Sequence, residues 1–234
     1  MKHQFAIFNK NLLISNDNRQ IIISDSESYN RIINVLRLNE GEDLIIFDKL
    51  NFYELKLVKI NKRDILFLIL SSNPIMSDKP KINIALGLLK KENFENALHN
   101  ASLVGINSVQ PLYTELIHRN WWSDKFLNRF ESVMSAACEQ SKNFAMPNIL
   151  APLSLTEYLN NHAPKNLMVC DPRGERLAKC SLYEQYTLLI GPEAGFSQSE
   201  MVYLNDYHKY SLVDNILTSY DAVFAVGIIM SNLC

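Results

Sequence analysis

The sequence predicts an α/β protein in two parts, a small β-rich part at residues 1–73 and a larger domain at residues 74–234. In the first part, short runs rich in Ile, Leu, Phe and Tyr are separated by turn residues, which is typical of a β barrel or sandwich. In the second, apolar strands alternate with segments of helical periodicity, which favours a mostly parallel sheet covered on both faces. The segment 71–80, with two prolines and three serines, predicts a linker between them.

In the first part, one helix interrupts the strands. We expect strands at 5–8, 20–24, 42–48, 52–60 and 64–70, and a helix at 28–37. Gly41 lies in a turn before the third strand, which separates it from the preceding helix.

In the second part, strands and helices follow one another to the end of the chain. We expect strands at 81–89, 106–113, 166–171, 186–191 and 210–213, and helices at 91–104, 123–142, 198–207 and 219–233. Gly105 is the expected C-cap of the first helix. Phe126, Phe130, Val133 and Ala137 form the expected apolar stripe of the second.

The overall composition argues against several classes of protein. With 234 residues and a formal net charge of −2, the chain has no general basic field, although a local basic patch would suffice for RNA. We expect no signal peptide, because the first residues lack its pattern, and no membrane span, because no apolar run is long enough. The four cysteines are scattered and form no CxxC pair, so we expect reduced thiols, no metal site and a cytoplasmic location.

The stretch LLIGPEAGFSQSE at 188–200 ends an apolar run in a glycine turn and then begins a helix. Gly195 can adopt a left-handed conformation or allow a close approach of the backbone, and Ser197 with Glu200 has the spacing of a helix capping box. Open parallel sheets bind ligands at the carboxyl ends of their strands, but a turn without a ligand fits the local pattern equally well. The known phosphate-binding glycine patterns are absent, so an uncharged or cationic ligand fits better than a phosphate.

The stretch LLIGPEAGFS resembles LxIGPEGGFS of the ribosomal RNA small subunit methyltransferase E family, enzymes of the SPOUT class that methylate N3 of a uridine in bacterial 16S ribosomal RNA. Further matches are VLRLNEGEDL (35–44) to VLRLKxGDxI, NSVQPLYTE (107–115) to IxPLxTER, AACEQS (136–141) to EAAEQS, and SLVDNILTSYDAVFAVG (211–227) to SLGxRILRxETAxxxA. Because the matches follow the family's order over nearly the whole chain, the chain is identified as a divergent member.

The resemblance implies an N-terminal PUA-like β-barrel that docks RNA and a C-terminal SPOUT domain, the alpha/beta-knot fold with a deep trefoil knot. In this family the knot binds S-adenosylmethionine (S-adenosyl-L-methionine), and the enzymes work as homodimers. The implied cofactor-binding residues are Leu86, Gly87, Ile190, Gly191, Pro192, Glu193, Gly195, Leu212, Asn215, Ile216 and Leu217. The basic residues expected to contact RNA are Arg31, Arg37, Lys90 and Lys91.

The motifs keep their apolar and glycine positions but lose polar ones. Ala194 replaces the second glycine of GPEGG, and Tyr220 replaces the acid of ETA. Family arginines are replaced by Asn215 and Thr218 in RILR, and by Leu116 in TER. Lys142 and Asn143 replace the last two residues of EQSGR, and Asn93 and Asn96 replace the arginine and tryptophan of KxDRxxW. Neither Asn nor Thr replaces the charged fork of arginine. Where a lost glycine needs positive φ, alanine costs about 1 kcal/mol.

Methylation at N3 requires an unpaired uridine, loss of the N3 proton and alignment of N3 with the methyl–sulfonium bond. The cofactor brings the reactive group, so no protein nucleophile is needed. Glu193 and Asp214 are candidate proton acceptors, although Glu193 can equally serve only to shape its loop. Trp121 and Trp122 suit either base stacking or anchoring of a helix.

The main hypothesis is an S-adenosylmethionine-dependent rRNA (uridine-N3-)methyltransferase that acts on 16S rRNA of the small ribosomal subunit. The missing arginines leave open a catalytically weakened or inactive homologue that binds RNA or the ribosome without methyl transfer. A metabolite-binding α/β protein that kept the pocket and lost RNA is a third alternative. DPRGERLAK at 171–179 suits phosphate contacts or, more simply, a solvated turn.

Overall fold

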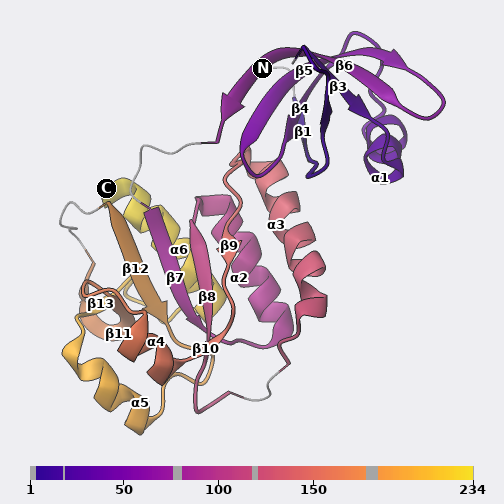
Figure 1. The fold of residues 1–234 in the computed structure, drawn as a ribbon. Helices are drawn as coiled ribbons and strands as arrows, with labels where there is room; N and C mark the ends of the chain where they lie inside the picture. Colours follow the sequence, from indigo (N-terminus) through magenta and orange to yellow (C-terminus); the bar gives the residue numbers. More distant parts are fainter. Residues whose placement is uncertain (1–3, 18, 76–80, 118–120, 178–183, 234) are drawn as a thin grey trace. The chain divides into compact units, whose positions relative to one another are not determined.

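The structure is a computed structural model that describes residues 4–17, 19–75, 81–117, 121–177 and 184–233. The chain divides into two compact units (Figure 1). The first comprises Met1–Met76 together with Cys138–Ala145, and the second comprises Ser77–Ala137 together with Met146–Cys234. The division falls inside helix α3 (Leu127–Ser141), so the last turn of that helix belongs to the first unit.

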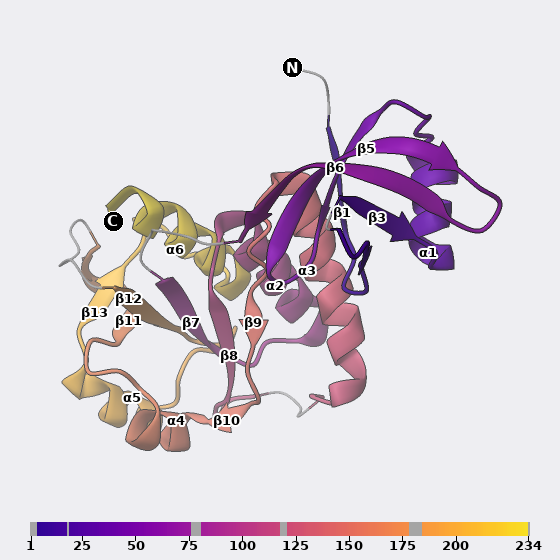
Figure 2. The same cartoon turned by 45° about the horizontal axis from the view of Figure 1, so that its top comes forward.

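The first unit is a curved sheet of six strands in the order β1-β4-β5-β6-β3-β2 (Figure 2). The strands are β1 (Phe5–Phe8), β2 (Leu13–Ile14), β3 (Gln20–Ile23), β4 (Asp43–Phe47), β5 (Asn51–Ile60) and β6 (Ile65–Pro74). β1 and β4 pair in parallel, and the other neighbours pair antiparallel. One apolar cluster, which includes Ile7, Ile21, Leu44, Leu55 and Phe67, fills the inside of the sheet. The expected strands are therefore present, with the two-residue β2 in addition.

The expectation of a single helix at 28–37 is wrong, because two short helical segments occupy this region. The Asp25 side chain accepts a hydrogen bond from Ser28 N, so helix α1 begins earlier and covers Ser26–Asn30. A π-helical turn, η1, follows at Arg31–Val35. Its spacing is set by the hydrogen bond from Leu36 N to Arg31 O, five residues back along the chain.

The expected linker begins too early in the sequence. Residues 71–74 belong to β6, where Asn73 pairs with Phe52 and Pro74 pairs with Asn51 of β5. Pro74 is tolerated because it is the last residue of the strand. The rest of the expected linker, 76–80, lies outside the described residues.

The second unit contains a seven-stranded sheet in the order β10-β8-β7-β12-β11-β13, with β9 paired to β8. The strands are β7 (Lys81–Gly87), β8 (Ser108–Tyr113), β9 (Asn148–Ile149), β10 (Leu153–Ser154), β11 (Met168–Arg176), β12 (Gln185–Ile190) and β13 (Lys209–Ser211). Within the described residues these strands pair in parallel, as the alternation of strands and helices predicted. All carboxyl ends therefore lie at one edge of the sheet.

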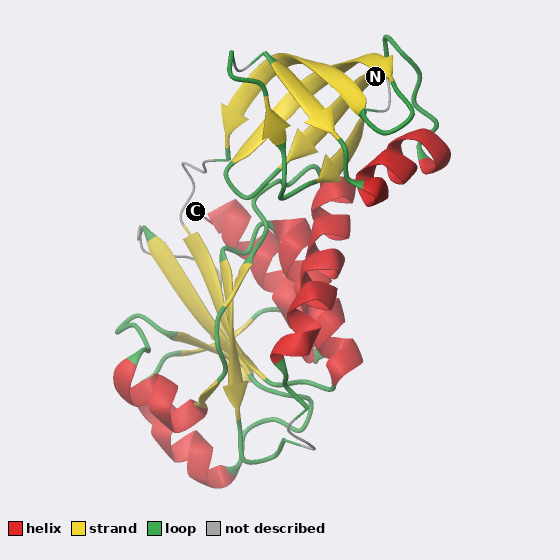
Figure 3. Cartoon of the chain, turned by 45° about the vertical axis from the view of Figure 1, so that its right-hand side comes forward, coloured by secondary structure: helices red, strands yellow, loops and turns green. Residues whose placement is uncertain are grey.

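Helices cover both faces of this sheet, α2, α3 and α6 on one side and α4 and α5 on the other (Figure 3). Their bounds are α2 (Lys91–Val104), α4 (Leu155–Asn161), α5 (Gln198–Tyr203) and α6 (Ser219–Leu233), with short 3₁₀ turns η2 (Asp124–Phe126) and η3 (Leu204–Asp206). α2 ends at Gly105 in the left-handed conformation, as expected. The buried apolar residues of α3 are Phe130, Met134, Ala137 and Cys138, and Glu139 is buried as well. The expected stripe was therefore partly misplaced, since Phe126 and Val133 are only half-buried.

Residues 171–176 form a strand and not the solvated turn that was expected at 171–179. β11 continues to Arg176 and pairs with β13 across a register shift between Cys170 and Glu175. Gly174 permits this pairing, because a Cβ atom there would lie 2.5 Å from the Lys209 carbonyl group. Residues 178–183 lie outside the described chain.

None of the helices in the described ranges combines the length and the apolar character that a bilayer span requires. Over the same ranges, no group of three or more His, Cys, Asp or Glu side chains is arranged to bind a metal ion.

Candidate active site

β7 and β12 end side by side, and the chain then turns sharply at Gly191 and Pro192. Ile190 pairs with Leu86 in parallel register. A Cβ atom on Gly87 would lie 2.5 Å from Pro192 Cδ and 2.6 Å from Pro192 N. Residue 87 must therefore be glycine, because the end of β7 and the glycine turn pack backbone against backbone.

The turn after Pro192 is closed by a backbone hydrogen bond of 2.9 Å from Gly195 N to Pro192 O. Gly195 has a φ of 74°, the left-handed conformation expected for it. The non-glycine residues with positive φ in the described chain are Arg37 and Lys142, and Ala194 is not one of them. The alanine at 194 therefore causes no backbone strain.

Glu193 joins the glycine turn to helix α2. Its Oε1 accepts hydrogen bonds from Lys90 N at 3.1 Å and from Asn93 Nδ2 at 2.8 Å. The Lys90 side chain provides no cap, so the Glu193 carboxylate takes that place at the positive end of the helix. These contacts favour the loop-shaping role of Glu193 over the role of proton acceptor.

The expected capping box at the start of α5 is present. Glu200 is buried, with 4% of its surface exposed, and its Oε2 accepts from Ser197 N at 2.9 Å. Its Oε1 accepts from Glu115 N at 2.8 Å, which ties the loop after β8 to the start of α5. Hydrogen bonds from Ser197 and Ser199 hold the pKa of Glu115 below its usual value. The segment from Gly191 to Glu200 is thus fixed at both ends.

The second loop predicted to bind the cofactor, Leu212–Leu217, is much more open. Leu212 is buried, and Leu217 packs against the same apolar cluster, which also contains Leu86 and Ile190. Asn215 is exposed and Ile216 is 83% exposed. The structure thus brings the apolar members of the predicted site together and leaves the tip of this loop in solvent.

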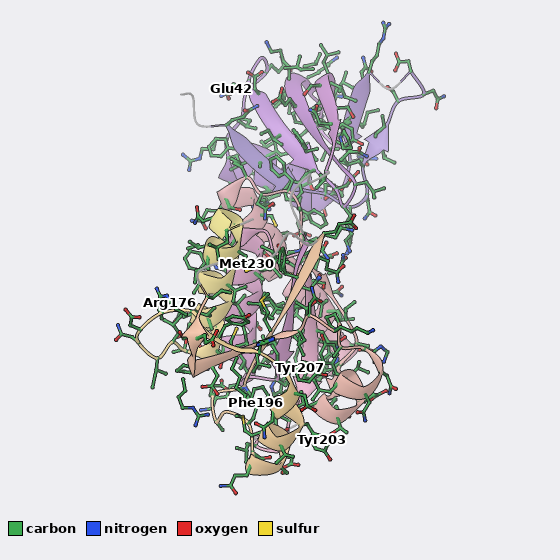
Figure 4. All side chains as sticks on the ribbon, turned by 90° about the vertical axis from the view of Figure 1, so that its left-hand side faces the viewer. Glu42, Arg176, Phe196, Tyr203, Tyr207 and Met230 are labelled. Carbon is green, nitrogen blue, oxygen red and sulfur yellow. The ribbon has the colours of Figure 1, made fainter. Side chains whose placement is uncertain are left out.

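Asp214, the other candidate proton acceptor, lies in the same open loop. Its Oδ1 accepts a hydrogen bond of 2.9 Å from Arg176, which is labelled in Figure 4. The Asp214 side chain is 96% exposed and that of Arg176 is 52% exposed. Solvent screening keeps the stabilisation by such a surface ion pair small, so Asp214 can exchange partners.

Two residues that replace family arginines have contacts of their own. Thr218 Oγ1 accepts from Asp221 N at 3.3 Å and donates to Asp221 Oδ2 at 2.7 Å, which caps the start of α6. Asn93 donates to Glu193. At both positions the substitution keeps a hydrogen-bonded role in the local structure without the arginine charge.

A pocket of about 590 Å³ lies beside the glycine turn. It is lined by 88–91, which lead from β7 into α2, by 116–117 after β8, by Trp121, and by 192–194 of the turn itself. Most of these side chains are apolar, and the charged ones are Lys90, Lys91 and Glu193. An apolar pocket with a few convergent charges at the carboxyl edge of a parallel sheet is a typical ligand site.

The four basic residues expected to contact RNA differ in their surroundings. Arg31 forms a bidentate ion pair with the buried carboxylate of Glu139, so its guanidinium already has a partner within the first unit. Arg37 is exposed and has a φ of 55°. Lys90 and Lys91 line the pocket, where the Lys91 ammonium lies 3.8 Å from the centre of the Phe126 ring. The lysines are thus better placed for a ligand than Arg31.

The sequence did not indicate Leu116 and Ile117 as pocket residues, and it left base stacking and helix anchoring both open for Trp121. The structure shows Trp121 and Trp122 in an aromatic cluster with Phe94 and Phe130, which supports the anchoring role for both. Trp121 alone of the pair also lines the pocket. No signal in the local sequence separates two adjacent tryptophans.

Comparison with known proteins agrees with this architecture. The model of an RNA methyltransferase domain matches residues 77–231, and that of an RNA methyltransferase PUA domain matches residues 23–70. The ribosomal RNA small subunit methyltransferase E of Mesomycoplasma hyopneumoniae is 27% identical over 167 residues, 69% of this chain and 72% of the relative. The enzyme of the same name from Helicobacter pylori strain J99 is 29% identical over 181 residues, 75% of this chain and 78% of the relative.

Among solved structures, the ribosomal RNA small subunit methyltransferase E of Neisseria gonorrhoeae, bound to S-adenosylmethionine, superposes with a TM-score of 0.82. The match covers 99% of this chain and 98% of that one at 21% identity. The fold class predicted from the sequence, a PUA-like domain followed by an α/β SPOUT domain, is confirmed, as is the resemblance to the methyltransferase E family. Because one family model covers residues 77–231, well over half of the chain, this protein belongs to the RNA methyltransferase family.

Proposed function

We propose that this protein transfers the methyl group of S-adenosylmethionine to N3 of a uridine in 16S ribosomal RNA of the small ribosomal subunit, and that it does so in the cytoplasm. The observation that carries the proposal is the backbone-to-backbone contact of Gly87 with Pro192. It sets the glycine turn at the carboxyl edge of the sheet, directly beside the pocket. The relatives named as methyltransferases of small-subunit ribosomal RNA support the choice of substrate.

The residues at this edge suit S-adenosylmethionine. We assign the cofactor to the turn Ile190–Gly195, to Leu86 and Gly87, and to the open loop Leu212–Leu217. The position of a Cβ on Gly195 has no neighbour within 4 Å, so this side of the backbone is open to a ligand. Ile216 is 83% exposed, and a bound ligand would cover it. The apolar surroundings and the lack of a phosphate-binding glycine pattern fit an adenosyl group with a cationic sulfonium.

The cofactor supplies an electrophilic methyl group, and the chain has to place N3 in line with it and exclude water. Glu193 keeps the turn in position through α2, so we give it no role as proton acceptor. Asp214 is the candidate acceptor for the N3 proton, since it is exposed and, within the described residues, its side chain bonds to a surface arginine alone. We expect Asp214→Asn to lower kcat more than the affinity for S-adenosylmethionine, whereas Arg176→Gln should change kcat little.

Three departures from the family pattern fit the local structure without disturbing it: Ala194 has no positive φ, Thr218 caps α6, and Asn93 bonds to Glu193. These three positions do not favour the inactive-homologue alternative. The match to an RNA methyltransferase domain likewise does not favour a metabolite-binding protein.

Two measurements test the proposal. Calorimetric titration should show binding of S-adenosylmethionine at submillimolar concentration, and no binding at millimolar ligand would overturn it. Mass spectrometry of 16S ribosomal RNA should show N3-methyluridine in cells with the gene and its loss in the deletion strain. A deletion strain that keeps its N3-methyluridine, with every other methyl mark unchanged, would contradict the assignment.

We also propose that the protein is a homodimer that pairs through α6. Phe224 and Ile228 are 38% and 44% exposed and lie one turn apart on this helix. Exposed apolar stripes of this kind are typical of protein interfaces. Light scattering should give a dimer for the wild type and a monomer for Phe224→Asp combined with Ile228→Asp. Val202→Asp, on an exposed residue of α5, is the control and should remain a dimer.

A further inference from the structure

Among the described residues that line the pocket beside the glycine turn, Trp121 is the aromatic one. We propose that the Trp121 indole is the platform on which the target base of the RNA stacks once it leaves its own strand. The identity of that base rests on the proposed function. Stacking on Trp121 does not depend on methyl transfer and can be tested without it.

The Trp121 ring is fixed in place before any ligand arrives. Its Nε1 donates a hydrogen bond of 2.7 Å to Leu89 O, at the end of β7. The rings of Phe94, Phe126 and Phe130 pack against it, with centroids 5.7, 6.0 and 6.2 Å away. A ring already held by a hydrogen bond and by three neighbouring rings loses little conformational freedom when a base stacks on it. The indole is nevertheless only half-buried, so part of its surface remains available.

The rest of the pocket suits a nucleotide with its phosphate. Leu116 and Ile117 provide apolar contacts for a base, and Lys90 and Lys91 provide positive charge. Neither ammonium forms an ion pair with a carboxylate in the described part of the chain, and Lys91 instead lies over the ring of Phe126. Glu193, the acidic residue of the pocket, is engaged at the start of α2. An unpaired RNA nucleotide presents the matching chemistry, a flat base and an anionic backbone.

Trp122 is a matched control for Trp121. It packs against the same two rings, with centroid distances of 5.6 Å to Phe94 and 5.6 Å to Phe130. It is not part of the pocket lining. Substitutions at 121 and 122 should therefore damage the aromatic cluster to a similar extent, but only those at 121 should affect a stacked base.

The first experiment uses fluorescence, because the chain has only two tryptophans. Trp122→Phe leaves Trp121 as the sole tryptophan, and Trp121→Phe leaves Trp122. Titration with a short uridine-containing single-stranded RNA should quench Trp121 strongly and Trp122 little. An abasic RNA of the same length, which keeps the phosphates, should quench neither. Equal quenching of both tryptophans, or none of Trp121, overturns the proposal.

The same titration with S-adenosylhomocysteine distinguishes a base pocket from a cofactor pocket. We expect the cofactor product to bind without quenching Trp121 and without displacing the RNA. Direct competition between the two ligands would assign the pocket to the cofactor and overturn the stacking proposal.

The second experiment measures methyl transfer to small ribosomal subunits purified from a strain that lacks the gene. Trp121→Leu should lower kcat/KM for RNA by about tenfold to a hundredfold, the range expected for one lost stacking contact. Its affinity for S-adenosylmethionine should stay unchanged. Trp121→Phe should restore most of the activity because it keeps a ring. Trp122→Leu should affect activity only as far as it affects folding, measured as the melting temperature.

These outcomes separate the two proposals. If RNA quenches Trp121 in Trp122→Phe but the wild type transfers no methyl group, the proposed function fails and the stacking site remains. If the wild type methylates its RNA and Trp121→Leu is as active as Trp122→Leu, the stacking site fails and the proposed function remains.

Discussion

The two loops assigned to the cofactor differ in how completely the protein holds them. The glycine turn after β12 is tied down by Gly87, by the contact of Glu193 with α2, and by the buried Glu200. The loop after β13 is anchored at Leu212 and Leu217, but its tip is exposed, and Asp214 forms a surface hydrogen bond with Arg176. The first loop is therefore formed before a ligand binds, whereas the second lacks contacts that a ligand can provide.

The difference predicts which kind of measurement each loop will affect. Changes in the first loop should lower stability and ligand affinity together, because its shape depends on packing within the protein. Changes at the tip of the second should leave stability nearly unchanged and affect ligand affinity alone. Substitutions in the two loops test this distinction.

Gly87→Val should have the largest effect. The added side chain overlaps Pro192, so it must displace the turn or the end of β7. We expect a loss of about 1–3 kcal/mol in the free energy of unfolding and loss of detectable S-adenosylmethionine binding. Denaturant unfolding and calorimetry measure the two. The control is Gly195→Ala, which has open space around it and should cost only about 1 kcal/mol for its left-handed backbone. If Gly87→Val binds the cofactor normally, the first loop is not held by this contact.

Glu200→Ala should come next. It removes the acceptor of two backbone N–H groups, those of Ser197 and Glu115. Hydrogen bonds to a buried charged group contribute roughly 1.5–3 kcal/mol, and we expect a loss of that size in the free energy of unfolding. Glu157→Ala is the control, because Glu157 lies in the first turn of α4 but is exposed. Equal effects of the two substitutions would contradict the role of burial.

Ile216→Ala tests the second loop. Because Ile216 is 83% exposed, the free energy of unfolding should change by no more than about 0.5 kcal/mol. The affinity for S-adenosylmethionine should fall about tenfold, which corresponds to about 1.4 kcal/mol of lost contact. Val202→Ala, on a 66% exposed residue of α5, should change neither quantity. A large loss of stability in Ile216→Ala would remove the contrast between the loops.

The smallest effects should come from two positions where the family pattern has glycine, and they should have opposite signs. Lys142 has a φ of 60°, so Lys142→Gly should relieve strain and stabilise the protein by about 0.5–1 kcal/mol. Ala194 has no such strain, so Ala194→Gly should destabilise it by about 0.4–1 kcal/mol through the freer unfolded chain. Thermal or denaturant unfolding measures both changes in the free energy of unfolding. Changes of the same sign at both positions would contradict the backbone argument.

Much of the fold followed from local rules. Three local features were expected correctly, because each depends on a few adjacent residues. They are the C-cap at Gly105, the left-handed conformation of Gly195, and the capping box of Ser197 and Glu200. The linker and the turn at 171–176 were misjudged for a shared reason. Strand pairing with a partner elsewhere in the chain extended β6 and β11 through residues whose local preference is for turns.

The sequence by itself determined the α/β class and the order of the main strands and helices, because these depend on periodicity and on conformations that few residues can adopt. The SPOUT and PUA-like assignment and the proposed cofactor positions came from the resemblance of its motifs to a known family. Only the tertiary structure decided that Arg31 pairs with Glu139, that Glu193 caps α2, and that Trp121 rather than Trp122 faces the pocket. Each of these contacts joins segments far apart in the chain. No local preference encodes such a contact, because it exists only once the sheets have assembled.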